Sequence, residues 1–203
     1  MSTQMLFLAT LVILLSSMQC HAVQYTVTNN AGNSTSSVHF SRDIGIPYSL
    51  KTLTEANNFI WRVFHQNVAK DRKSVAKVSM FLENMDGVAY TINDEIHVSA
   101  TYLGGFSGDV KREFTGVLHN EMTRGLIEGI ADFVRLRSGY VPGHWVRPGQ
   151  GDRWDQGYDV TAHFLDYCNG LRKGFVAKLN KKMRTGYSNN YFVDLLGKSV
   201  DQL

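Results

Sequence analysis

Alternating apolar and polar side chains predict several short strands in the first half of the chain. Gln24 to Thr28 alternates and is rich in β-branched residues, as in a strand with one buried face. Three further segments have the same character: Lys77 to Leu82, Val88 to Ile92 and Glu95 to Ser99. Asn93-Asp94 suits a two-residue turn between the last two. The stretch from Asn29 to Ser37 is mainly Asn, Gly and Ser and is predicted to be a loop.

The rest of the chain has helical spacing. After Pro47, apolar residues recur three and four positions apart from Leu50 to Phe64, which predicts one long amphipathic helix. From Asp109 to the end the pattern is helical, with breaks at Gly139 to Asp152 and near Gly170 to Gly174. Strands followed by helices, without strand–helix alternation, indicate an α+β fold. We expect a small N-terminal sheet packed on helices and a helical C-terminal half.

The N-terminus has the features of a secretory signal peptide. The apolar run from Met5 to Leu15 is too short to span a bilayer, and Cys20-His21-Ala22 ends in a small residue at the expected cleavage edge. We predict a signal peptide over residues 1–22 and one domain over residues 23–203; a membrane anchor is the alternative. After export and cleavage of the signal peptide, the mature protein is expected to be extracellular and not attached to a membrane. Export also makes the sequon at Asn33 a candidate glycosylation site.

Composition adds little specific chemistry. The chain has 2 Cys, and cleavage would remove Cys20, so the mature protein would have no internal disulfide. Cys168 lies in a helical pattern and is interpreted as a small buried hydrophobe. Three aromatic residues are interpreted as packing anchors: Trp61, Trp145 and Trp154.

The net charge is mild, at +3 from 21 basic and 18 acidic side chains. Its densest run, Lys178 to Arg184, is predicted to be the solvated face of a short helix, with an anion or nucleic-acid site as the alternative. No base-stacking aromatic pattern accompanies the run, so no nucleic-acid partner is predicted. A weak attraction to acidic cell-wall polysaccharide stays open.

One hexapeptide carries the most specific chemical information. His119-Asn120-Glu121-Met122-Thr123-Arg124 resembles the His-Glu-x-x-His helix of zinc proteases with its metal ligands removed. In that helix two imidazoles four residues apart bind zinc, and the Glu handles the proton of the metal-bound water. Here Asn and Arg stand near the ligand positions, and neither suits zinc.

The surrounding sequence closely resembles the plant basic secretory protein family, which has relatives among plant and bacterial metallopeptidases. The resemblance covers essentially the whole mature chain and is carried most clearly by two blocks, Gly125 to Leu136 and Gly143 to Ala162. It implies a zincin-like arrangement, with the active-site helix beneath the edge strand of the sheet. For intact members it implies zinc-dependent peptide hydrolysis.

Residue by residue, this chain departs from the family at its metal site. The family run normally reads Tyr-His-Glu-Met-Thr-His, so Asn120 replaces the first His, Glu121 is retained, and Arg124 sits at or beside the second His. A tryptophan-bearing, glycine-rich linking stretch before Gly125 is absent. Glu128 matches a candidate third ligand, and His119 falls one residue too early to be a ligand. We therefore predict that Glu121 is a vestigial catalytic residue and that no zinc is bound. The vestigial metal positions are Asn120, Arg124 and Glu128.

Loss of the linking stretch predicts a change of geometry. Apolar residues from Phe114 to Phe133 follow one stripe at periods of three and four, which suits a single fused helix kinked at Gly125 or Gly129. In such a helix Arg124 and Glu128 would form an (i, i+4) ion pair.

Three functional hypotheses follow. The first is a secreted, monomeric, defence-associated protein that lacks zinc catalysis and binds peptide, protein or cell-wall material; the defence role is implied by the resemblance alone. The second is an active zinc metallopeptidase that recruits other imidazoles, for which His97, His144 and His163 are available. The third is a non-functional truncated variant of such an enzyme.

Overall fold

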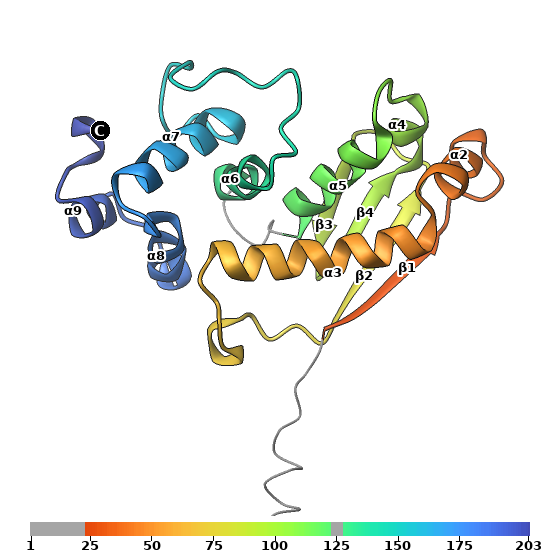
Figure 1. The fold of residues 1–203 in the computed structure, drawn as a ribbon, viewed down its shortest axis with the longest axis horizontal. Coiled ribbons are helices and arrows are strands. Elements are labelled where there is room, and N and C mark those ends of the chain that lie inside the picture. The colour runs from red at the N-terminus through yellow and green to blue at the C-terminus, as the bar shows by residue number, and fades with distance from the viewer. Residues whose placement is uncertain (1–22, 123–127) are drawn as a thin grey trace, which may run out of the picture.

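The structure is a computed structural model that describes residues 23–122 and 128–203. The predicted signal peptide and Arg124 lie outside the described residues. The elements in chain order are β1 (Gln24–Asn29), α2 (Thr35–Asp43), α3 (Gly45–Val63), η1 (Ala69–Asp71), β2 (Lys77–Glu83), β3 (Ala89–Ile92), β4 (Glu95–Ser99), α4 (Ala100–Gly105), α5 (Val110–Glu121), α6 (Glu128–Ser138), α7 (Tyr158–Leu171), α8 (Phe175–Lys182), η2 (Met183–Thr185), α9 (Asn190–Leu196) and η3 (Val200–Gln202). This is the α+β arrangement predicted from the sequence, with a helical C-terminal half (Figure 1).

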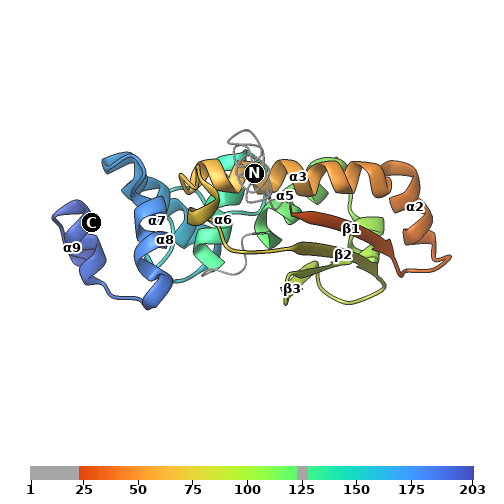
Figure 2. The ribbon, with the colours of Figure 1, turned by 90° about the horizontal axis from the view of Figure 1, so that it is seen from below.

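The four predicted strands form one sheet in the order β1-β2-β4-β3. Strands β1, β2 and β4 run parallel, whereas β3 is an antiparallel edge strand paired with β4. The turn between β3 and β4 is Asn93-Asp94, and both residues have positive φ, 51° and 61°, as a tight two-residue hairpin requires. Helices α3 and α5 lie on the same face of the sheet (Figure 2). The alternate residues Met80, Leu82, Ile96 and Val98 are buried, which explains the alternating sequence pattern.

Helix α3 is the long helix predicted after Pro47. It begins two residues earlier, at Gly45, with Pro47 in its first turn, where a missing backbone N–H breaks no helical hydrogen bond. Its buried residues Leu53, Ala56 and Ile60 follow the helical period. The helix runs from the sheet to the C-terminal helices (Figure 1).

Helix α2 corrects the predicted loop from Asn29 to Ser37. The helix begins at Thr35, and the Ser34 hydroxyl caps it by accepting from the Ser37 backbone N–H at 3.2 Å. Ser37 and Phe40 are its buried residues, so the apolar stripe is too narrow for periodicity to reveal.

Two hydrophobic clusters stabilise the molecule. One lies between the sheet and the helices beside it, around Leu53, Met80 and Phe114. The other joins the C-terminal helices to the end of α3, and Trp145 and Trp154 pack against it, as predicted. Among the described residues, no helix is both long and apolar enough to cross a bilayer.

Candidate functional site

Glu121 is the last residue of helix α5 and is held at the edge strand. Helix α5 starts at an Asp109 cap, whose carboxylate accepts from the Arg112 backbone N–H at 3.0 Å. At its other end Glu121 is only 5% exposed. The Thr91 hydroxyl of β3 lies 2.8 Å from Glu121 Oε2 and 3.2 Å from the Glu121 backbone oxygen. The retained carboxylate is thus buried and bound to β3.

Asn120 is engaged by the neighbouring helix. Its Nδ2 donates to Asp132 Oδ1 of α6 at 2.6 Å, and Asp132 is 7% exposed. Where the family has an imidazole, this chain therefore has an amide that already binds a carboxylate. Asp132 was not singled out from the sequence, because a single acidic residue within a helical pattern gives no local signal.

Glu128, the candidate third ligand, is not part of the cavity lining described beside Glu121. It is exposed at the start of α6. Arg124, and with it the predicted Arg124–Glu128 ion pair, lies outside the described residues.

Helices α5 and α6 pack side by side, so the predicted fused helix is wrong. Arg135 Nη2 donates to both carboxylate oxygens of Glu113 at 3.0 Å, across 22 positions of sequence. One continuous helix would separate these residues by about 33 Å. Gly116 permits the approach, since a Cβ there would lie 3.0 Å from the Arg135 guanidinium. Helices α5 and α6 are thus two packed elements.

Three imidazoles make contacts that give them structural roles, whereas His144 is exposed. His119 is 5% exposed; its Nδ1 donates to the Thr115 carbonyl at 2.8 Å and its ring contacts Phe59, and burial lowers its pKa. His97 lies 2.9 Å from Glu83 Oε2 and stacks on Tyr90, and His163 Nε2 donates to the Val146 carbonyl at 3.0 Å. These contacts favour neither His97 nor His163 as a ligand beside Glu121.

The donor set does not suit a catalytic zinc ion. Such an ion needs about three protein ligands and one open position. Over residues 23–122 and 128–203, no group of three or more His, Cys, Asp or Glu side chains is placed to hold a metal. Asn120 and Glu121, the two motif positions described, already have hydrogen-bond partners.

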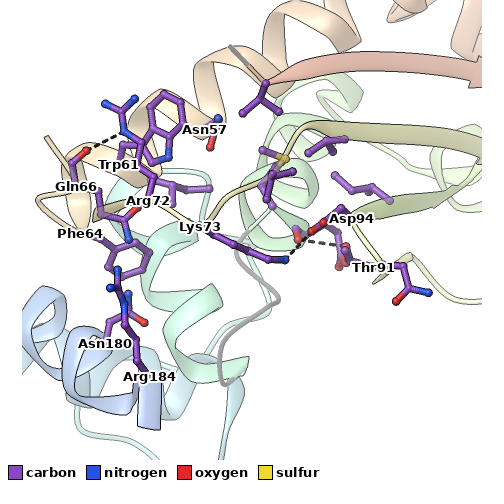
Figure 3. Close-up of a pocket in the computed structure, with 18 residues that line it drawn as sticks. Asn57, Trp61, Phe64, Gln66, Arg72, Lys73, Thr91, Asp94, Asn180 and Arg184 are labelled. Atoms are coloured by element: carbon purple, nitrogen blue, oxygen red, sulfur yellow. Dashed lines mark hydrogen bonds and ion pairs between the residues drawn. The ribbon is translucent and has the colours of Figure 1, made fainter. Parts of the chain in front are cut away.

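A cavity of about 730 Å³ opens beside Glu121, between the sheet and the C-terminal helices (Figure 3). Its apolar lining residues are Val23, Ile60, Phe64, Val75, Val78, Ile96 and Met122. Its other walls carry polar or charged side chains, among them Trp61, Arg72, Lys73, Asp94, Asn180 and Arg184. Carboxylate and guanidinium groups thus share one concave, largely preformed space, as in many binding sites.

Most of these cavity residues carry no functional signal in the sequence. Trp61 was interpreted as a packing anchor, and it is half-buried, with the Arg72 guanidinium 3.7 Å above its ring. In the basic run, Lys178 and Lys181 are exposed and Lys182 pairs with Asp194 at 2.9 Å, as a solvated face predicts. Arg184 instead lines the cavity. Only the packing of α8 and η2 reveals this difference, because all four basic residues look alike in sequence.

Comparisons with known proteins identify the family. A family profile described as "peptidase of plants and bacteria" matches residues 20–203. A "Basic secretory protease" of Boswellia serrata is 69% identical over 29 residues, which are 14% of this chain. The chain spans 45% of the length of that relative. No solved structure matches the chain. Because the profile match covers nearly the whole described fold, the chain belongs to the basic secretory protein family of plant and bacterial peptidases.

Proposed function

We propose that this chain is a secreted, non-catalytic member of its family that binds peptide segments in the cavity beside Glu121. The observation that carries the proposal is the contact between Asn120 and Asp132, 2.6 Å long, at the position where the family has a zinc-binding imidazole. A carboxylate alone cannot make water a strong nucleophile at neutral pH, because the bound metal normally supplies most of that pKa shift. The scaffold and its cavity persist, and they can still bind a chain.

The cavity supports peptide binding by its shape and lining. At about 730 Å³ it lies within the usual range of ligand sites. Apolar side chains such as Ile60 and Phe64 offer contacts to peptide side chains, and Thr91 and Asn57 offer polar groups. Edge strand β3 stands beside it, and an edge strand has backbone groups that an extended peptide can pair with.

Secretion to the apoplast and a role in defence are further parts of this proposal. The apolar run before Ala22 supports export, and the family resemblance suggests defence. A fluorescent fusion expressed in plant cells should be found outside the plasma membrane, with an N-terminus near Val23. A fusion that stays in the membrane and still begins at Met1 would contradict export.

Zinc content and peptidase activity test the catalytic part. We expect the purified secreted chain to contain no stoichiometric zinc and to show no chelator-sensitive cleavage of casein, and Glu121→Gln to change neither result. The positive control is a chain in which the intact family segment, with its linking stretch, replaces residues 120–124. Cleavage by the natural chain that both a chelator and Glu121→Gln abolish would show an active metallopeptidase with ligands not recognised above.

A further inference from the structure

Asn180, a residue of the cavity wall, has a buried acceptor that is unsatisfied among the described residues. The residue belongs to helix α8, is 8% exposed and lines the cavity. Its Oδ1 is buried and has no hydrogen-bond partner among the described residues. A buried carbonyl oxygen without a donor costs free energy, and such atoms are rare in folded proteins. Once the Asn180 side chain turns this oxygen toward the cavity, an N–H group of a bound molecule would remove the cost.

The Arg72 guanidinium is held in one orientation, and its two Nη atoms have no acceptor among the other described residues. Its guanidinium stacks on the Trp61 ring at 3.7 Å, and its Nε donates to the Gln66 carbonyl at 3.0 Å. The stack and the hydrogen bond fix the plane of the group. Neither of its Nη atoms has a hydrogen bond to another described residue, and no described carboxylate lies within 4.0 Å.

Arg184 adds a second guanidinium to the same cavity. Its Nη2 donates to the Asp71 carbonyl at 2.6 Å, one residue before Arg72, and it too has no carboxylate partner in the described parts of the chain. Lys73 differs, since its Nζ is 2.7 Å from Asp94 Oδ1. Figure 3 shows Asn180 and Arg184 near Phe64 and the Lys73–Asp94 pair across the cavity. One end of the cavity is therefore cationic and lacks an internal counter-ion among the described residues.

We propose that this cavity selects peptides that carry a carboxylate. The Arg72 and Arg184 guanidiniums bind the carboxylate, and Asn180 Oδ1 accepts a peptide N–H. The inference rests on the proposed peptide binding and adds its specificity. Charge-assisted hydrogen bonds to guanidinium are the strong ones in such sites. The apolar floor around Ile60 and Phe64 favours peptide side chains over an acidic polysaccharide, and the Glu121 carboxylate in the same cavity disfavours a more highly charged phosphate.

Fluorescence anisotropy with matched peptide pools tests the proposal. Three labelled pools differ only in charge: central Glu-Glu with an amidated C-terminus, central Gln-Gln with an amidated C-terminus, and central Gln-Gln with a free C-terminus. We expect at least one carboxylate pool to bind about tenfold more tightly than the neutral pool. The two charged pools distinguish a side-chain carboxylate from a terminal one.

Single substitutions test which side chains produce the preference for carboxylate peptides. Arg72→Gln and Arg184→Gln should each remove most of the preference, whereas Arg72→Lys should retain part of it. Asn180→Asp places an acidic group at the cationic end and should weaken binding of the carboxylate pools more than binding of the neutral pool. The control is Lys178→Gln. It removes one positive charge from an exposed position of α8 and should leave the carboxylate preference unchanged. If Arg72→Gln does not fold, Arg184→Gln changes an exposed side chain and still tests the proposal.

The outcomes separate this inference from the function it rests on. Equal affinity for all three pools would overturn carboxylate selection and leave peptide binding intact. Failure of every pool to bind would overturn the proposed function itself. Stronger competition by an oligogalacturonide than by the Glu-Glu pool would identify a polysaccharide site and also overturn the proposal.

Discussion

Gly129 lets helices α6 and α7 approach more closely than any side chain would allow. A Cβ at this position would lie 2.3 Å from Cγ2 and 2.6 Å from Cβ of Thr161. Thr161 cannot easily move, because its hydroxyl donates to the Trp154 carbonyl and accepts from the Gly157 backbone N–H, both at 2.8 Å. Gly129 belongs to the block from Gly125 to Leu136 that resembles the family. Close helix packing gives a steric reason for glycine at this position.

Gly129→Ala should therefore destabilise the protein by about 1–3 kcal/mol through overpacking. Urea denaturation measures the loss as a lower midpoint at unchanged slope. The matched control is Gly170→Ala in helix α7, where a Cβ meets nothing within 4 Å and should be neutral or stabilise by up to about 1 kcal/mol. Equal midpoints for the two variants would show that α6 and α7 can separate without cost.

At the scale of elements, the helix pair α5 and α6 shows what sequence patterns can and cannot predict. Periodicity predicted helical segments from Asp109 onward, and the strands of the sheet, because each has its own apolar face. It could not distinguish one fused helix from two packed ones, since the same spacing from Phe114 to Phe133 suits both. The Glu113–Arg135 contact that decides the matter joins residues 22 positions apart.

Breaking this ion pair should destabilise the helix pair. Both side chains are 11% exposed, and the Tyr102 hydroxyl also donates to Glu113 at 3.0 Å. Arg135→Met leaves a nearly buried carboxylate without its cation and should cost about 3 kcal/mol of unfolding free energy. The double variant with Glu113→Leu should cost less than the sum of the single changes.

The exposed pair Arg153–Asp155 supplies the comparison. Its side chains are 73% and 40% exposed, so Asp155→Asn should leave the urea midpoint nearly unchanged. Additive costs at Glu113 and Arg135 in the double-mutant cycle would show that the two residues do not stabilise each other.

At the scale of the whole molecule, the cavity is the feature that the sequence patterns predict least. Its walls come from the sheet with its β3–β4 turn, from α3 and the segment after it, from the end of α5, and from the α8 region. No two of these share a motif. The sequence did identify Glu121, because a family motif marks it. Packing between distant segments brings Arg72, Asn180 and Arg184 to the same cavity.

The burial of one thiol and one phenol group predicts that the folded protein loses stability at alkaline pH. Burial raises the pKa of Cys168, in the C-terminal cluster, and of Tyr102, beside the sheet, to about 12 from 9.0 and 10.0. Both groups stay protonated in the folded protein but ionise earlier in the unfolded chain. Their stabilising contribution is complete below about pH 9 and is lost as pH rises toward about 12.

Melting temperatures should accordingly fall across this range, and Cys168→Ala should move the start of the fall toward the ordinary pKa of Tyr, about 10. The 0% exposure of Cys168 also predicts that thiol reagents modify it only after unfolding. Parallel pH profiles of the natural chain and the Cys168→Ala variant would contradict the assigned thiol contribution.

Helix α3 joins the two hydrophobic clusters into one cooperative unit. It is 19 residues long, about 28 Å, and contributes Leu53 to the cluster at the sheet and Ile60 to the cluster of the C-terminal helices. Neither half can open fully without exposing apolar side chains of the same helix. Any change of sequence between the halves therefore acts on both clusters at once.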